Sequence, residues 1–221
     1  MENTIFHRTE EQSPGKRISA NLYNLVIGLV LGWGFLVNWV MVKTIPIESI
    51  ATINPFMFFI GYFASCMFGV YLYSKSEVPL ISFIGYNFVV VPFGLIINMV
   101  VHRYNPDLVL NAIMVTGVVT LVMMVLGSLF PKFFEKIVGA LTIALIAVII
   151  VEMIAAFIFH VQYGIIDWIV IVIFCGYIGY DWGRANSIPK TLDNAVDSAA
   201  SLYMDIINLF IRILRVMGRR Q

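Results

Sequence analysis

Long apolar runs recur along the chain, separated by short linkers that contain turn-forming residues. A membrane-spanning helix needs about 20 mostly apolar residues. Six such runs can be placed: Asn21 to Met41, Pro55 to Tyr73, Leu80 to Val101, Leu108 to Phe130, Ile137 to Phe159 and Ile165 to Tyr180. With 60% apolar and 12% charged residues, the chain lies far outside the range of soluble domains. Because backbone polar groups must be satisfied inside a bilayer, the runs predict an all-α integral membrane protein.

A seventh segment, from Leu192 to Met217, is apolar enough to enter a bilayer but also carries ionisable residues. At about 100° per residue, its polar side chains fall within roughly 120° of one another on a helix. These are Asp193, Asp197, Ser201, Asp205, Asn208, Arg212 and Arg215. Such a stripe cannot face lipid, so it must face a protein interior. We therefore predict a seven-transmembrane-helix bundle with a central polar C-terminal helix.

Basic residues are distributed unevenly between the predicted loops. The N-terminal tail and the second, fourth and sixth loops hold most of them, whereas the opposite loops hold only Lys43 and Arg103. Because cytoplasmic loops carry an excess of Lys and Arg, this asymmetry predicts a cytoplasmic N-terminus. We expect residues 1–18 to form a cytoplasmic tail and residues 19–221 to form one transmembrane domain.

The end of the seventh segment conflicts with this rule. A full crossing would place four arginines on the outer side: Arg212, Arg215, Arg219 and Arg220. Either the helix crosses and its arginines pair within the bundle, or it re-enters and both termini are cytoplasmic. Glu152 in the fifth span and Asp167 near the outer start of the sixth are outer-mouth groups in one interpretation; in the other, Glu152 is a hydrated acid close to the interface.

Two carboxylates stand out. Asp181 closes the sixth span and Asp205 lies deep in the seventh segment. A carboxylate at a helix C-terminus meets the negative end of the helix dipole, so Asp181 needs a partner unless the helix continues. If the last helix packs its polar face there, the two carboxyl groups meet in a low dielectric where both cannot readily ionise. They would share a proton, which makes the pair a pH switch, or bind a cation such as Ca²⁺, which prefers oxygen ligands.

The neighbours of Asp205 on the stripe are candidates for supporting roles. Asn208, three residues on, could hydrogen-bond Asp205 directly, whereas Arg212 could reach it only indirectly. Asp193 lies near the helix start, where a capping or first-turn role is favoured over a ligand role. Asp197 fits a structural and a functional role equally.

The C-terminal third carries an ordered set of motifs: Gly179-Tyr180-Asp181, Leu192-Asp193-Asn194-Ala195, Ser201-Leu202-Tyr203-Met204-Asp205-Ile206-Ile207-Asn208-Leu209-Phe210 and Leu214-Arg215. This order resembles the transmembrane Bax inhibitor motif family (Bax inhibitor-1 family), in particular its bacterial YetJ-like branch. The resemblance is strong over about residues 175 to 217 and elsewhere rests on the number and spacing of the spans. It implies a seven-helix bundle whose last helix is central.

The resemblance also implies a function. The family's carboxylate pair falls on Asp181 and Asp205, where it would act as a pH-sensitive gate on a calcium leak pathway, sharing a proton in the closed state. YetJ-like members carry arginines at the cytoplasmic end of the second helix, near the pair. Here Lys75 is the nearest substitute, and a lysine lacks the bidentate fork of an arginine. Another branch of the family is understood to regulate a membrane-bound protease, so a regulatory role without ion flux is the alternative.

Other functions are less well supported. An intramembrane aspartyl protease would use two membrane aspartates, but Gly-x-Gly-Asp and Pro-Ala-Leu do not occur in the sequence. A net charge of +1 and the lack of phosphate-binding motifs argue against nucleic acid as a partner. We expect no enzyme activity, no organic cofactor, calcium ions and protons as ligands, membrane lipid as surroundings, and a monomer in a bacterial plasma membrane.

Overall fold

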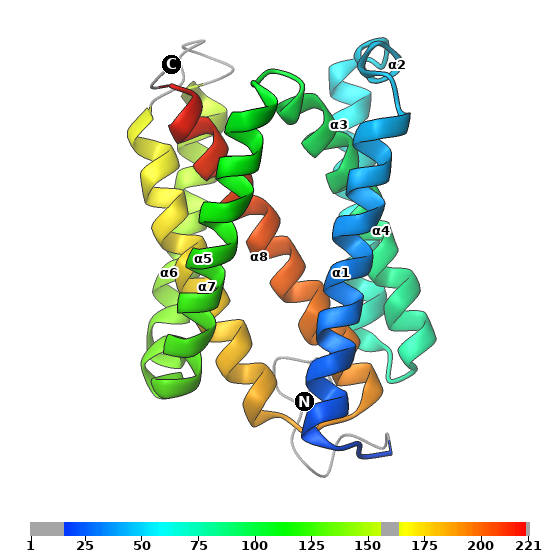
Figure 1. Cartoon of the computed structure of the whole chain (residues 1–221), viewed down its shortest axis with the longest axis vertical. Coiled ribbons are helices and arrows are strands. Elements are labelled where there is room, and N and C mark those ends of the chain that lie inside the picture. Colours follow the sequence, from blue (N-terminus) through cyan, green and yellow to red (C-terminus); the bar gives the residue numbers. More distant parts are fainter. Residues whose placement is uncertain (1–15, 156–163, 220–221) are drawn as a thin grey trace. The chain divides into compact units, whose positions relative to one another are not determined.

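The chain is almost entirely helical. The computed structural model describes residues 16–155 and 164–219, and within these ranges it has eight helices (Figure 1). These are α1 (Ala20–Thr44), α2 (Ile47–Ala51), α3 (Pro55–Lys75), α4 (Pro79–Val101), α5 (Pro106–Leu129), α6 (Pro131–Ile154), α7 (Gly164–Ser187) and α8 (Leu192–Gly218). The all-α prediction is therefore confirmed.

Prolines set the starts of four helices. Pro55, Pro79, Pro106 and Pro131 each occupy the first position of a helix, where the missing N–H has no partner to lose. Asparagines also cap α3 and α5; the side chain of Asn105, for example, accepts from the Asp107 N–H. The prolines and asparagines of the linkers thus mark where the next helix begins. The five-residue helix α2, which follows Pro46, was not predicted.

Six of the described helices are long and apolar enough to cross a membrane: α1, α3, α4, α5, α6 and α7. They match the six predicted apolar runs, although residues 156–159 of the fifth run lie outside the described residues. A seventh helix of this kind is not confirmed. Helix α8, at 27 residues, is long enough to cross a membrane, but its composition is too polar for it to count among these helices.

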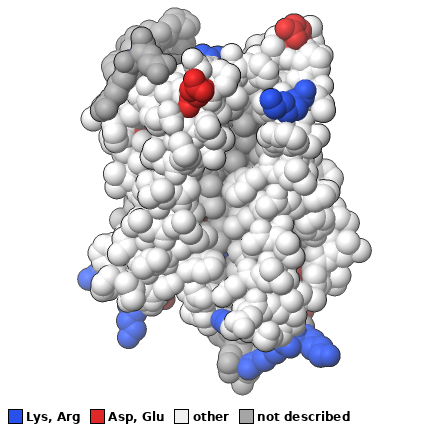
Figure 2. Space-filling model, viewed as in Figure 1, with Lys and Arg blue, Asp and Glu red and all other residues white. Residues whose placement is uncertain are grey.

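Helix α8 is instead enclosed by protein. Between Asp193 and Val216 its residues are buried, apart from Met204, Asn208, Arg212 and Arg215, which are half-buried. Asp193, Asp197, Ser201 and Asp205 of the polar stripe are buried, and most of the apolar side of the helix is buried as well. The other long helices expose many large apolar side chains. On the face drawn in Figure 2, charged side chains lie near helix ends, with broad uncharged surface elsewhere.

The chain forms two compact units, and α8 contributes to both. The first unit contains α1 to α4 and the segment Ser187–Met204. In it, α4 packs against α1, α2 and α3. The second unit contains α5, α6, most of α7 and the part of α8 that begins at Asp205. The predicted boundary between a tail and a membrane domain at residue 18 stays a prediction, because residues 1–15 lie outside the described residues.

Close helix contacts in each unit depend on glycines. A Cβ on Gly85 of α4 would lie 2.7 Å from the carbonyl oxygen of Gly69 in α3 and 2.9 Å from the Leu72 Cβ. In the second unit, Gly127 of α5 and Gly179 of α7 meet backbone to backbone. Small residues of this kind let membrane helices approach closely, which is a main source of their packing energy.

We predict that Gly85→Leu lowers the free energy of unfolding by about 3 kcal/mol, because the added side chain forces α3 and α4 apart. Thermal unfolding of the purified protein in detergent measures the effect. Gly28→Leu is the matched control, since no described atom lies within 4 Å of a Cβ at that position. Equal unfolding temperatures for the two variants would contradict the proposed contact.

Candidate functional site

The carboxyl groups of Asp181 and Asp205 meet in the second unit. Asp181 lies in α7 and is 6% exposed, and Asp205 lies in α8 and is 7% exposed. A side-chain hydrogen bond joins them. Two ionised carboxylates have no proton to donate, so a contact of this kind suits a pair that shares one proton. The structure thus brings together the two residues that the sequence singled out, while their role as an ion site stays a prediction.

Local packing positions Asp181. Helix α7 does not end at Tyr180, as the apolar run suggested, but continues to Ser187, so Asp181 is inside the helix rather than at its end. Two residues before and after it, Gly179 and Gly183 face α6 and α5: a Cβ on Gly179 would meet the ring of Phe134, and one on Gly183 would lie 3.0 Å from the Gly127 carbonyl oxygen. This close packing holds the part of α7 that carries Asp181 against α5 and α6.

Arg184 completes this group and was missed by the sequence reasoning. Its Nε lies 3.6 Å from Oδ1 of Asp181, and the two side chains are 7% and 9% exposed. The guanidinium also acts electrostatically on Asp205. Their spacing of three residues could have indicated this contact in the sequence, because residues three apart lie on one face of a helix. We define these three residues, Asp181, Arg184 and Asp205, as the carboxyl-pair site.

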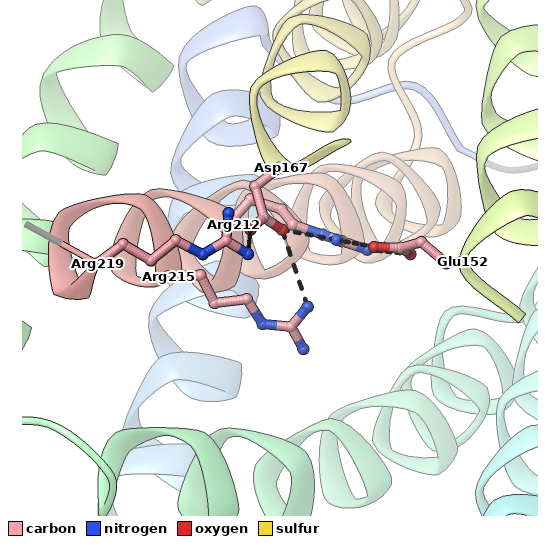
Figure 3. Close-up of polar contacts among 5 residues, drawn as sticks. All are labelled: Glu152, Asp167, Arg212, Arg215 and Arg219. Carbon is pink, nitrogen blue, oxygen red and sulfur yellow. Dashed lines mark hydrogen bonds and ion pairs between the residues drawn. The ribbon is translucent and has the colours of Figure 1, made fainter. Parts of the chain in front are cut away.

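A second charged group joins the ends of α6, α7 and α8 (Figure 3). Arg212 of α8 donates to both carboxylate oxygens of Glu152, with an Nη2–Oε2 distance of 2.7 Å, and to Oδ1 of Asp167 at 2.8 Å. Arg219 Nη2 lies 2.6 Å from Asp167 Oδ2, and Arg215 Nη1 lies 3.9 Å from Asp167 Oδ1. We call these five residues the arginine cluster.

The arginine cluster bears on the two sequence interpretations of the last helix. Helix α8 is unbroken, and its C-terminal end lies beside the start of α7, where Asp167 is only 2% exposed. The two helices therefore run antiparallel in the second unit and the arginines pair within the protein, while the side of the membrane on which α8 ends stays a prediction. Asp167 at a helix start and Arg215 at a helix end also complement the helix dipoles.

Two predicted residues have contacts that the sequence did not reveal. Arg212, which was expected to reach Asp205 only indirectly, places its guanidinium against Glu152 and Asp167, and a supporting role toward Asp205 stays a prediction. Glu152 forms a two-point ion pair with Arg212, and its position at an outer mouth or a hydrated interface stays a prediction.

The remaining predicted residues are divided between the units. In the first unit, Asp193 lies in the first turn of α8 and accepts a hydrogen bond of 2.7 Å from Ser82 Oγ, and Asp197 is fully buried. Lys75 is the last residue of α3 in the same unit. Asn208 is half-buried on α8 in the second unit. Supporting roles for these four stay predictions.

Oδ2 of Asp205 is buried and accepts no hydrogen bond from an N–H or O–H group of the described residues. A proton at the contact with Asp181 would satisfy a buried carboxyl oxygen in this state. Among the described residues, no three His, Cys, Asp or Glu side chains gather closely enough to hold a metal ion. A cation at this site would therefore keep other oxygen ligands in addition to the carboxyl pair.

Comparison with known proteins agrees with this architecture. The fold and the buried charges define a multi-pass helical membrane protein. A family model described as inhibitor of apoptosis-promoting Bax1 matches residues 16–221. The chain therefore belongs to the Bax inhibitor-1 family, as the sequence motifs indicated. Membership in the YetJ-like branch stays a prediction.

Individual relatives are distant. An uncharacterized protein of Helicobacter pylori is 29% identical over 169 residues, which are 73% of this chain and 70% of that protein. An uncharacterized membrane protein of Streptococcus pyogenes serotype M3 is 29% identical over 133 residues, 57% of this chain and 58% of that protein. Protein LIFEGUARD 3 of Arabidopsis thaliana is 48% identical over 54 residues, 24% of this chain and 21% of that protein.

We predict that Arg212→Gln destabilises the protein by about 3 kcal/mol, because it leaves Glu152 without its two-point partner and weakens the compensation of buried Asp167. The value is at the lower end for a broken buried pair, since Arg219 still contacts Asp167. Thermal unfolding in detergent is the measurement, with the exposed Arg103→Gln as control. An unchanged unfolding temperature in Arg212→Gln would show that the cluster contributes nothing to stability.

Proposed function

We propose that this protein is a pH-sensitive calcium leak channel gated by the pair Asp181 and Asp205. The observation that carries the proposal is the hydrogen bond between two buried carboxyl groups on two different helices. A shared proton makes this contact attractive, and loss of the proton leaves two neighbouring negative charges in a low dielectric. One protonation step thus changes the force between α7 and α8 from attraction to repulsion.

The same step would prepare the site for its cargo. A deprotonated pair presents carboxylate oxygens, the ligands that a hard cation such as Ca²⁺ prefers. Once the proton has left, the carboxylate oxygens of Asp205 would no longer hydrogen-bond Asp181 and would be available for that contact. Separation of the helices and attraction of the cation would then arise from the same charge change, so the path opens as the pH rises.

Several attributes are part of this proposal. The N-terminus would lie in the cytoplasm, because the basic residues are unevenly distributed between the loops. The membrane would be a bacterial plasma membrane, the working unit a monomer, and the protein would have no enzyme activity and no organic cofactor. Family membership and six apolar helices support the membrane location in general.

A regulatory role without ion flux is the second candidate. The matching family model is described as an inhibitor of apoptosis-promoting Bax1, which favours a protein that acts on a partner. A membrane-bound protease is the partner that the family resemblance suggests. A variant lacking residues 2–15 separates the two candidates. A channel keeps its calcium flux without these residues, whereas a protein that conducts no calcium in either form is better explained as a regulator.

We predict that calcium flux into liposomes containing the purified protein rises about tenfold between about pH 5 and pH 8, because a single proton loss opens the path. Asp181→Asn and Asp205→Asn should each abolish this pH dependence, since neither variant has a carboxyl pair. Asp107→Asn, at an exposed position at the start of α5, is the matched control and should behave like wild type. Flux that is absent in the wild type, or that titrates equally in all four proteins, would refute the gating role.

A further inference from the structure

Arg215 is the most weakly held arginine of the arginine cluster. Its Nη1 lies 3.9 Å from Oδ1 of Asp167, too far for a hydrogen bond, whereas Arg212 and Arg219 lie 2.8 and 2.6 Å from the two oxygens of the same carboxylate. In Figure 3 a single contact joins the guanidinium of Arg215 to the other residues drawn. Within the described residues, the side-chain N–H groups of Arg215 thus have no hydrogen-bond acceptor, although only 36% of the side chain is exposed.

The cluster also contains more positive than negative charge. Within the described residues, its three arginines contact two acidic residues, Glu152 and Asp167. Glu152 is already held at two points by Arg212. Tyr104, which also acts electrostatically on Arg215, has a phenol rather than a carboxylate. The charge of Arg215 is therefore only partly compensated, and the cluster attracts a further anion.

Arg215 and Arg219 are arranged to bind such an anion together. They are four residues apart, so they lie on one side of α8, and their side chains are 36% and 39% exposed. The guanidinium of Arg219 lies against Gly164 at the start of α7, in space that a Cβ would occupy. Two neighbouring guanidinium groups offer the forked donors that match the oxygens of a phosphate.

Exposed apolar side chains begin beside the cluster. On α7, four residues at helical spacing are each 44–67% exposed: Ile165, Trp168, Ile169 and Val172. We call these four residues the α7 apolar stripe. Because α7 is apolar enough to cross a membrane, the stripe is suited to contact lipid chains, and a tryptophan near a helix end is typical of the headgroup level. The phosphate group that a membrane offers at this level belongs to a lipid.

We propose that Arg215 and Arg219 bind the phosphate of an anionic phospholipid, whose acyl chain lies along the α7 apolar stripe. Basic pockets between membrane helices bind lipid headgroups in this way. A zwitterionic lipid such as phosphatidylcholine is bound less well, because its own ammonium group offsets the charge of its phosphate. Free phosphate has no chain to place on the stripe. The inference is independent of the proposed ion flux and of the carboxyl-pair site.

The test measures which lipid lies beside Trp168. The full chain is placed in phosphatidylcholine nanodiscs with increasing fractions of phosphatidylglycerol, either lipid being brominated near the headgroup end of its chains, since bromine quenches nearby tryptophans. The part of the quenching that is lost in Trp168→Phe reports the lipid at the α7 apolar stripe. The wild-type protein should prefer phosphatidylglycerol over phosphatidylcholine about fivefold or more, the effect of one or two arginines near an anionic lipid. Equal quenching by the two lipids in the wild type would overturn the inference without any arginine variant.

Arginine variants then identify the groups that bind the headgroup. Arg215→Gln should lower the preference about fivefold, whereas Arg215→Lys keeps the charge and should retain part of it. Arg103→Gln removes the same charge at an exposed position outside the cluster and is the matched control, which should keep the wild-type preference. An undiminished preference in Arg215→Gln, or an equal loss in Arg103→Gln, would overturn the assignment.

Inorganic phosphate distinguishes the lipid from a soluble ligand. Phosphate added to the wild-type nanodiscs, at an ionic strength matched with chloride, should leave the quenching unchanged. Displacement of the lipid by phosphate but not by chloride would show a site for soluble phosphate and overturn the lipid assignment. Calcium flux enters none of these measurements, so a failure of the proposed function and a failure of this inference are observed separately.

Discussion

Ionisable side chains on α8 must be neutralised where they lie, because the surrounding low dielectric cannot solvate them. Each unit meets this requirement in its own way. In the first unit, Ser82 donates a hydrogen bond to Asp193. In the second, Asp205 shares a hydrogen bond with Asp181, and Arg212 is held by two carboxylates. These contacts explain how a helix too polar to face lipid remains stable: protein groups replace the water that its charges would otherwise need.

The two charged groups of the second unit differ in chemistry. The arginine cluster is made of ion pairs, and because a guanidinium keeps its charge at all physiological pH values, its contacts do not depend on a proton near neutrality. In the proposed function the carboxyl-pair site holds one shared proton, so its net charge would change when that proton leaves. The arginine cluster is suited to holding the end of α8 against α6 and α7, whereas the carboxyl-pair site is suited to responding to pH.

Apolar length was sufficient to locate six spans, because the bilayer requires about 20 apolar residues per helix wherever the helix lies. It was less informative about helix ends. Helix α6 begins at Pro131, six residues before the predicted run, since Lys132, Glu135 and Lys136 are charged but still helical. Helix α7 extends past Asp181 for the same reason. The short helix α2 escaped notice because five residues show no periodicity.

The sequence by itself determined the membrane class, the family, the polar stripe on α8 and the two outstanding carboxylates. Hydropathy and helical periodicity are local properties, so they can be read along the chain. Tertiary structure decided the partners. It paired Asp181 with Asp205, paired Arg212 with Glu152 and Asp167, and placed Arg184 beside the carboxyl pair. Those contacts join residues up to 60 positions apart, and only helix packing brings such side chains within a few ångströms.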